Sequence, residues 1–216
     1  MKHLLFDLDG TIIEPQEGIL NSLRYAVKMM GVVMPSDDEL RQFIGPPIMD
    51  SFQRQFGLSP SEALEGIQYF RNYYAQSGIH QNTLFPHISA MLEILDKEGY
   101  KLYVATSKPT VFAKDILQKH GLDHLFVAIV GSNLDNSRSD KAEIIGYILE
   151  TYQLNPSHCV MIGDTPYDII GAKKHYIRSV GVTYGHGQFQ HHQADFAVED
   201  VYQLEELIKR EFPIVI

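Results

Sequence analysis

Apolar runs of strand length alternate with amphipathic helical stretches from residue 86 onward. The apolar runs are residues 102–106, 126–131, 159–163 and 179–182. The helical stretches are residues 88–98, 111–120, 141–152 and 168–175. Strands buried on both faces of a parallel sheet are apolar throughout, because helices cover both faces. We therefore predict an α/β protein with a Rossmann-like, three-layer parallel sheet, completed by a first strand that ends at Phe6, a short strand at 196–198 and a closing helix at 201–212.

The segment from residue 15 to 82 has a different pattern, with no run typical of a strand. Helical periodicity begins at residues 17–30, and Ser36 with Glu39 matches a capping box at the start of a second helix. Two more helical stretches follow, the last beginning at Ser59. This predicts a helical bundle, residues 15–82, inserted as a cap domain into a catalytic core made of residues 1–14 and 83–216.

Two aspartates follow the first apolar run, in Asp7-Leu8-Asp9-Gly10-Thr11. A structural turn explains such a short pattern as readily as a functional site does. Further polar groups after other predicted strands favour the site: Thr106 with Ser107, Lys141, and Asp164 with Asp168. In an open parallel sheet, ligands bind beyond the carboxyl ends of the strands. The sequence therefore predicts that these groups converge on one point.

Composition limits the function without naming it. With 216 residues and 44% hydrophobic residues, the chain can bury a substantial core. The net charge of −9, with no basic stripe, argues against nucleic acid as a partner. A single cysteine, Cys159, excludes an internal disulfide and fits a reducing compartment. We see no signal peptide and no apolar stretch long enough to span a bilayer, and so expect a cytoplasmic protein without a membrane partner.

The ordered motifs resemble those of the haloacid dehalogenase superfamily over nearly the whole chain. The four motifs are Asp7 to Thr11, Thr106-Ser107, Lys141, and Gly163 to Asp168, and the helical insertion resembles the first cap class of that family. Phe43-Ile44-Gly45-Pro46-Pro47 and Thr106-Ser107-Lys108-Pro109 are similar to the phosphoglycolate phosphatase branch. Relatives with a stretch like Gly131-Ser132-Asn133-Leu134-Asp135 are described as nucleoside 5'-monophosphatases.

The residue types fit phosphoryl transfer. A carboxylate can act as nucleophile by forming an aspartyl-phosphate, and we assign this role to Asp7. By the resemblance, Asp9 protonates the leaving alcohol and later activates water. Mg²⁺ prefers hard oxygen ligands, which Asp7 and Asp164 supply; the resemblance adds the backbone carbonyl of Asp9, and Asp168 as a support behind the ligands or through water. Lys141 would offset phosphoryl charge.

The remaining assignments concern the substrate. The Thr106 hydroxyl and the Ser107 backbone N–H are predicted phosphate contacts, together with Lys141. Gly45, Pro46 and Lys108 are predicted to influence specificity, although Lys108 at a helix start is equally compatible with a surface role. Asp168 has an alternative as a helix cap. A histidine group in the late loop, His186, His191 and His192, receives no role.

We therefore expect a Mg²⁺-dependent phosphatase acting on a small metabolite of the phosphoglycolate or nucleoside 5'-monophosphate type. A sugar phosphomutase shares the same core residues and is the first alternative. A phosphate-responsive receiver-like module is a more distant alternative, since the presence of Asp9 and of a helical insertion after the first strand counts against it. The sequence decides neither the substrate nor the oligomeric state.

Overall fold

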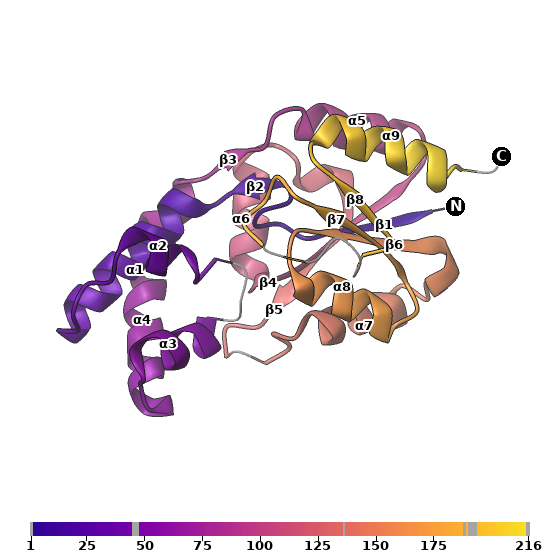
Figure 1. Ribbon diagram of the computed structural model, residues 1–216. Helices are drawn as coiled ribbons and strands as arrows, with labels where there is room; N and C mark the ends of the chain where they lie inside the picture. Colours follow the sequence, from indigo (N-terminus) through magenta and orange to yellow (C-terminus); the bar gives the residue numbers. More distant parts are fainter. Residues whose placement is uncertain (1, 45–47, 136, 188, 190–193, 215–216) are drawn as a thin grey trace. The chain divides into compact units, whose positions relative to one another are not determined.

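The computed structural model describes residues 2–44, 48–135, 137–187, 189 and 194–214. The chain forms two compact units (Figure 1). The core unit consists of Met1–Glu14 and Leu84–Ile216, and the helical unit of Pro15–Thr83. Among the residues that the structure describes, no helix combines the length and the apolar composition that crossing a bilayer requires.

The core unit is built on one parallel sheet, which confirms the predicted α/β fold class. Its strands are β1 (His3–Phe6), β4 (Lys101–Pro109), β5 (Phe126–Ser132), β6 (Cys159–Gly163), β7 (Arg178–Val182) and β8 (Phe196–Val198). The six strands follow the order β5-β4-β1-β6-β7-β8. The central strand β1 places Phe6 opposite Val104 of β4 and Ile162 of β6. The residues after Phe6, Val104 and Ile162 therefore leave the same edge of the sheet.

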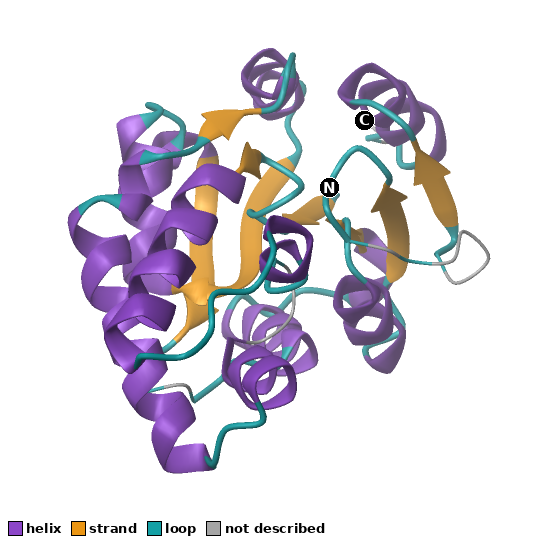
Figure 2. Ribbon diagram, turned by 60° about the vertical axis from the view of Figure 1, so that its left-hand side comes forward, coloured by secondary structure: helices purple, strands orange, loops and turns teal. Residues whose placement is uncertain are grey.

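Helices flank the strands of the core sheet (Figure 2). They are α5 (Ile88–Lys97), α6 (Thr110–Lys119), α7 (Lys141–Thr151), α8 (Pro166–Lys174) and α9 (Val201–Glu211). In Figure 1, α5 and α9 lie on one side of the strands, and α7 and α8 lie on the other. Short 3₁₀ turns at Asp123–Leu125 and Pro156–His158 precede β5 and β6.

Alternate residues of the strands pack on α7 and α8, as the period of two in a strand requires. Leu5, Tyr103 and Met161 share one buried cluster with Ile144 and Ile148 of α7. The residues between them, such as Leu4 and Val160, are equally buried and point to the other face. Burial on both faces explains the apolar runs at residues 4–6, 102–105 and 159–163 of these strands.

Two boundaries differ from the sequence-based expectation by more than one residue. The strand β4 continues to Pro109, past its predicted end at Thr106, because Pro109 pairs with Ser132 of β5 after a shift in register. The helix α8 begins at Pro166, ahead of the predicted start at Asp168, with Thr165 as its N-cap. Both differences lie next to predicted site residues.

The helical unit contains α1 (Gln16–Met30), α2 (Asp37–Arg41), α3 (Ile48–Phe56) and α4 (Pro60–Gln76), followed by a 3₁₀ turn at Gly78–His80. Two further short strands are β2 (Ile13–Glu14) and β3 (Thr83–Leu84). Capping boxes start α2 at Ser36 and α4 at Ser59, which satisfies backbone N–H groups that a helix start leaves unpaired. Phe52 of α3 is fully buried.

Candidate active site

Asp7 and Asp9 lie in a tight turn that directly extends β1. The backbone N–H of Asp7 donates to the carbonyl of Ile162 at 2.8 Å, so Asp7 leaves the sheet beside the end of β6. Gly10 has a φ of +77°, and a Cβ added there would lie 2.1 Å from Oδ2 of Asp164. Glycine is therefore required at this position by both the backbone conformation and the close approach of Asp164.

Lys141 connects two of the aspartates. Its Nζ lies 2.9 Å from Oδ1 of Asp7 and 2.8 Å from Oδ1 of Asp168, and it donates to the carbonyl of Ala105 at 2.8 Å. These contacts use all three donors of the ammonium group. Lys141 is the first residue of α7, where Asp140 provides the N-cap. With 3% of its surface exposed, Lys141 is a buried cation and not a solvated surface lysine.

The charge of Lys141 is stabilised by its partners. Burial alone would lower the pKa of the Lys141 ammonium, but the carboxylates of Asp168 and Asp7 outweigh burial and raise this pKa above its ordinary value. Lys141 therefore stays charged at neutral pH and neutralises part of the negative charge that the buried aspartates bring together.

Asp168 combines a capping role with a contact to Lys141. Its Oδ2 accepts hydrogen bonds from the backbone N–H and the hydroxyl of Thr165, at 3.0 and 2.7 Å, which completes a capping box at the start of α8. Its Oδ1 faces Lys141. The side chain is fully buried, so its helix-capping bonds also orient a carboxylate toward the centre of the site.

Asp164 follows β6 and is 2% exposed. Its Oδ2 accepts hydrogen bonds from the backbone N–H groups of His186 and Gly187, at 2.9 and 2.8 Å. Its Oδ1 is buried and has no hydrogen-bond partner among the residues that the structure describes. Burial, together with the charges of Asp7 and Asp168, raises the pKa of Asp164 to about 8. A carboxylate in this environment is stabilised by a cation.

The three carboxylates fit a divalent cation. Oxygen atoms of Asp7, Asp164 and Asp168 lie within 4.8 Å of one another, and all three residues are buried. Hard carboxylate oxygens are the ligands that Mg²⁺ prefers, and the Oδ1 atom of Asp164 still needs a partner. The arrangement brings together the aspartates that the sequence predicted for the metal, with Lys141 beside them.

Asp9 pairs with a second buried lysine. Nζ of Lys108 lies 2.9 Å from Oδ2 of Asp9, and only 6% of the Lys108 side chain is exposed. Burial raises the pKa of Asp9 although the charge of Lys108 acts in the opposite direction. The sequence left open whether Lys108 lies at the site or on the surface, and the structure shows that it contacts Asp9 of the predicted site.

The predicted phosphate contacts lie at the end of β4. The Thr106 hydroxyl accepts a hydrogen bond from the backbone N–H of Lys108 at 3.3 Å, and the Ser107 hydroxyl donates to the carbonyl of Ser139 at 3.2 Å. Thr106 is buried, and Ser107 is partly buried. The predicted specificity residues Gly45 and Pro46 lie outside the described residues.

Sequence reasoning missed the loop that holds Asp164. This loop, residues 184–187, follows β7, and the sequence analysis gave His186 no role. The two hydrogen bonds to Asp164 come from backbone N–H groups, which no side-chain pattern reveals. The available signal was the pair Gly185 and Gly187, since glycines at close intervals allow a backbone to approach another group.

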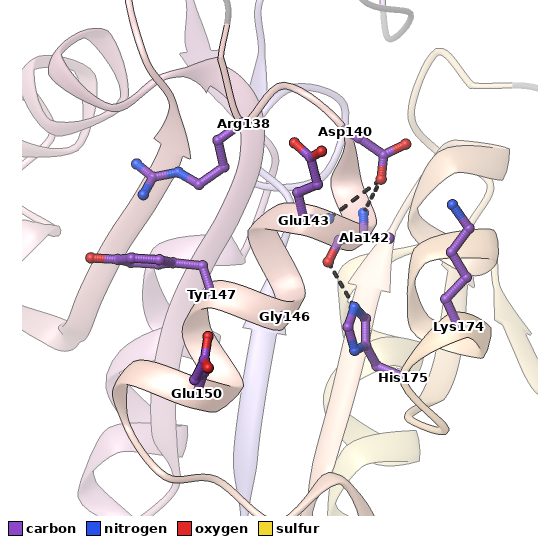
Figure 3. A pocket seen from close by; sticks show the side chains of 9 residues that line it. All are labelled: Arg138, Asp140, Ala142, Glu143, Gly146, Tyr147, Glu150, Lys174 and His175. Carbon is purple, nitrogen blue, oxygen red and sulfur yellow. Dashed lines mark hydrogen bonds between the residues drawn. The ribbon is translucent and has the colours of Figure 1, made fainter.

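A surface pocket of about 760 Å³ lies elsewhere on the core unit. Figure 3 shows its lining along α7 and the end of α8, with His175 bonded to the carbonyl of Ala142 at 2.7 Å. Arg138 stacks over the ring of Tyr147 at its edge. The lining contains none of the site aspartates Asp7, Asp9, Asp164 and Asp168, and Lys141 directs its ammonium group inward, toward Ala105. This pocket is therefore separate from the carboxylate site.

The family model described as "Haloacid dehalogenase-like hydrolase" matches residues 4–182. The chain belongs to the haloacid dehalogenase-like hydrolase family. A solved structure of a predicted phosphatase from Clostridium acetobutylicum has a TM-score of 0.93 and 38% sequence identity to this hydrolase, and the match covers 97% of this chain and 98% of the other. Family and fold therefore agree with the resemblance seen in the motifs.

Curated relatives of this haloacid dehalogenase-like hydrolase have different names. A 5'-nucleotidase of Pseudomonas aeruginosa is 37% identical over 210 residues, covering 96% of this chain and 95% of that protein. The tyrosine-protein kinase PtkA of Mycobacterium tuberculosis is 36% identical over 185 residues, covering 86% of this chain and 63% of that protein. A phosphoglycolate phosphatase of Vibrio parahaemolyticus is 28% identical over 219 residues, covering 96% of each chain.

Proposed function

We propose that this haloacid dehalogenase-like hydrolase is a Mg²⁺-dependent phosphatase that hydrolyses a small phosphomonoester through an aspartyl-phosphate on Asp7. The observation that carries the proposal is the buried group of Asp7, Asp164 and Asp168, in which Lys141 contacts Asp7 and Asp168 and the Oδ1 atom of Asp164 lacks a partner among the described residues. Such a group concentrates carboxylates where a cation and an anionic phosphoryl group can be balanced.

Asp7 is suited to be the nucleophile because its two oxygens differ. Its Oδ1 accepts a hydrogen bond from the backbone N–H of Leu8 at 2.7 Å and faces Lys141 at 2.9 Å. We assign the attack on phosphorus to Oδ2. The bond from Oδ2 to phosphorus forms as the bond from phosphorus to the leaving oxygen breaks, and water later releases phosphate from Asp7.

Asp9 is suited to transfer the proton. Its raised pKa favours a protonated carboxyl group that can donate to the leaving oxygen, and the resulting carboxylate can then accept a proton from the attacking water. Lys108, 2.9 Å away, stabilises that carboxylate between the two steps. Burial therefore favours the protonated state of Asp9, and the pairing with Lys108 favours the carboxylate, so the environment supports both states that the reaction requires.

The cation and the phosphate contacts complete the proposal. Asp7 and Asp164, with the backbone carbonyl of Asp9, would hold Mg²⁺, and Asp168 would support them from behind. When bound, Mg²⁺ supplies positive charge to the phosphoryl oxygens. Lys141 acts mainly as a fixed charge, because its three donors already have protein acceptors. Thr106 and Ser107 are the proposed phosphate contacts at the end of β4.

The substrate proposal follows the relatives. We propose nucleoside 5'-monophosphates as the first substrate class, supported by the 37% identity to a protein named 5'-nucleotidase, and phosphoglycolate as the second class to examine. A panel of both classes, scored by kcat/KM for phosphate release, ranks them directly. A hexose 1-phosphate belongs in the same panel, because a phosphomutase would produce an isomer in place of free phosphate.

The decisive experiment compares the wild type with Asp7→Asn. We expect Mg²⁺-dependent phosphate release over many turnovers from the wild type and none above background from the variant. In acid-quenched wild-type samples, mass spectrometry should find phosphate on the peptide that contains Asp7. The matched control is Asp96→Asn, which changes an exposed aspartate of α5 and should keep the wild-type rate.

Two results would contradict the proposal. Full activity of Asp7→Asn would remove the covalent mechanism. Phosphorylation of Asp7 without release of phosphate would instead support the receiver-like alternative.

A further inference from the structure

The loop of residues 184–187, called here the Asp164-binding loop, determines which oxygen of Asp164 is available. His186 and Gly187 both donate their backbone N–H groups to Oδ2, at 2.9 and 2.8 Å. The buried Oδ1 atom has no hydrogen-bond partner among the described residues. Since Oδ1 is the oxygen left over, the loop sets the direction in which Asp164 can bind a cation.

The loop lies in direct contact with the turn that carries Asp9. A Cβ added to Gly185 would lie 2.3 Å from the carbonyl oxygen of Gly10 and 2.5 Å from Oδ2 of Asp164. A Cβ added to Gly187 would lie 2.1 Å from the backbone oxygen of Asp164. Real Cβ atoms do not approach this closely. The backbone of the loop is therefore packed against the site without room for a side chain at either glycine.

Two side chains of the loop attach it to the segment that follows Asp9. The Tyr184 hydroxyl donates to the carbonyl of Thr11 at 3.0 Å, and the Tyr184 ring packs edge-on against Phe85 with 4.8 Å between ring centroids. Nε2 of His186 lies 2.6 Å from Oε1 of Glu14, and because a carboxylate only accepts, the ring nitrogen donates. Burial raises the pKa of Tyr184, so its hydroxyl stays protonated and can donate to the carbonyl of Thr11.

We propose that Tyr184 and His186 are positioning residues that fix Asp164 relative to Asp7 for cation binding. Thr11 and Glu14 belong to the same segment as Asp7 and Asp9, so both side chains tie the loop to the segment after β1 that provides the other carboxylate. Two ligands must reach the same ion, and an unanchored loop would let the Asp164 carboxylate turn away. This inference rests on the Mg²⁺ site of the proposed function.

Isothermal titration of the metal-free protein with Mg²⁺, in the absence of substrate, tests the inference. Tyr184→Phe and His186→Ala each keep the backbone N–H groups and remove only an anchor. Loss of a partner that orients a metal ligand typically weakens metal affinity about 10- to 100-fold. We therefore expect the double variant, which combines Tyr184→Phe with His186→Ala, to bind Mg²⁺ with a Kd about tenfold higher than that of the wild type. His186→Gln keeps a donor that can reach Glu14, and should recover most of the affinity lost in His186→Ala.

Matched controls change the same residue types where they are exposed. Tyr176 is 90% exposed, and His158 is exposed at the end of a 3₁₀ turn. Tyr176→Phe and His158→Ala should bind Mg²⁺ with the wild-type Kd. Thermal unfolding of every metal-free variant shows whether it is folded at the temperature of the titration.

The outcomes separate this inference from the proposed function. A wild-type Kd in the folded double variant would overturn the positioning role, even if its melting temperature falls, because the anchors would then serve stability alone. If the double variant does not fold, the single variants decide. A wild-type Kd for Mg²⁺ in folded Tyr184→Phe and His186→Ala would overturn the positioning role. A raised Kd in His186→Ala that is restored in His186→Gln would support it. A wild-type protein that binds Mg²⁺ but releases no phosphate from any substrate would contradict the proposed function and leave the positioning role standing.

Discussion

Replacing Asp164 by asparagine should make the metal-free protein more stable at alkaline pH. Asp164 is 2% exposed, and its pKa rises from 3.8 to about 8, first through burial and then through the charges of Asp7 and Asp168. The folded protein thus binds a proton that the unfolded chain releases near pH 4. This contribution to stability is fully present below pH 4 and is lost as the pH rises through 8.

The size of the effect follows from the shift. At about 1.4 kcal/mol per pKa unit, the whole shift corresponds to a free energy on the order of 6 kcal/mol. Between pH 6 and pH 8, the free energy of unfolding should fall by about 2 kcal/mol through this group alone. Asparagine has no proton to lose, while its amide oxygen can accept the hydrogen bonds from His186 and Gly187. The pH dependence from Asp164 should therefore be absent in Asp164→Asn.

Urea unfolding in the presence of a chelator, followed by circular dichroism at pH 6, 7 and 8, measures the difference. All other titratable groups are common to both proteins, so the difference between the two pH profiles isolates Asp164. Adding Mg²⁺ at pH 8 should stabilise the wild type, because binding to the folded state alone adds stability, and should stabilise Asp164→Asn much less. Equal loss of stability from pH 6 to pH 8 in both proteins would refute the reasoning.

Two further predictions concern the lysine and the proton donor. Lys141→Met leaves Asp7 and Asp168 buried without their cation, so unfolding in urea at pH 8 should show a loss of about 3–5 kcal/mol. Adding Asp168→Asn should recover part of that loss, and a double variant no more stable than Lys141→Met would contradict the pairing. Asp9→Asn should lower kcat about 10²- to 10⁴-fold in steady-state assays. An unchanged kcat would exclude Asp9 as the acid and base.

Elements were predictable where a periodic pattern and burial agreed. Residues 4–6 of β1 and the whole of β6 are buried on both faces and therefore form apolar runs, and the Ser36 and Ser59 helix starts appear with their capping boxes. The end of β4 was not predictable from hydrophobicity. Residues 106–109 are partly polar, yet the backbone still pairs with β5, because strand hydrogen bonds do not depend on the polarity of the side chains.

The candidate site shows the same division. Asp7, Thr106, Lys141, Asp164 and Asp168 follow or lie at strand ends in the sequence, and parallel pairing brings those ends to one edge of the sheet. Lys108 stood at a position compatible with a surface role, and the shift in register within β4 accompanies its placement beside Asp9. Its burial depends on neighbours that are distant in sequence.

The sequence by itself determined the fold class, the family and the residues that form the carboxylate site, because hydrophobic periodicity and motif order are local properties of the chain. Only the tertiary structure decided how those residues are held. The ammonium group of Lys141 contacts Asp7, Asp168 and the carbonyl of Ala105. The backbone N–H groups of residues 186 and 187 donate to one oxygen of Asp164, Oδ2. Such contacts join segments far apart in the chain, and backbone donors are the same in every non-proline residue, so no sequence pattern records them.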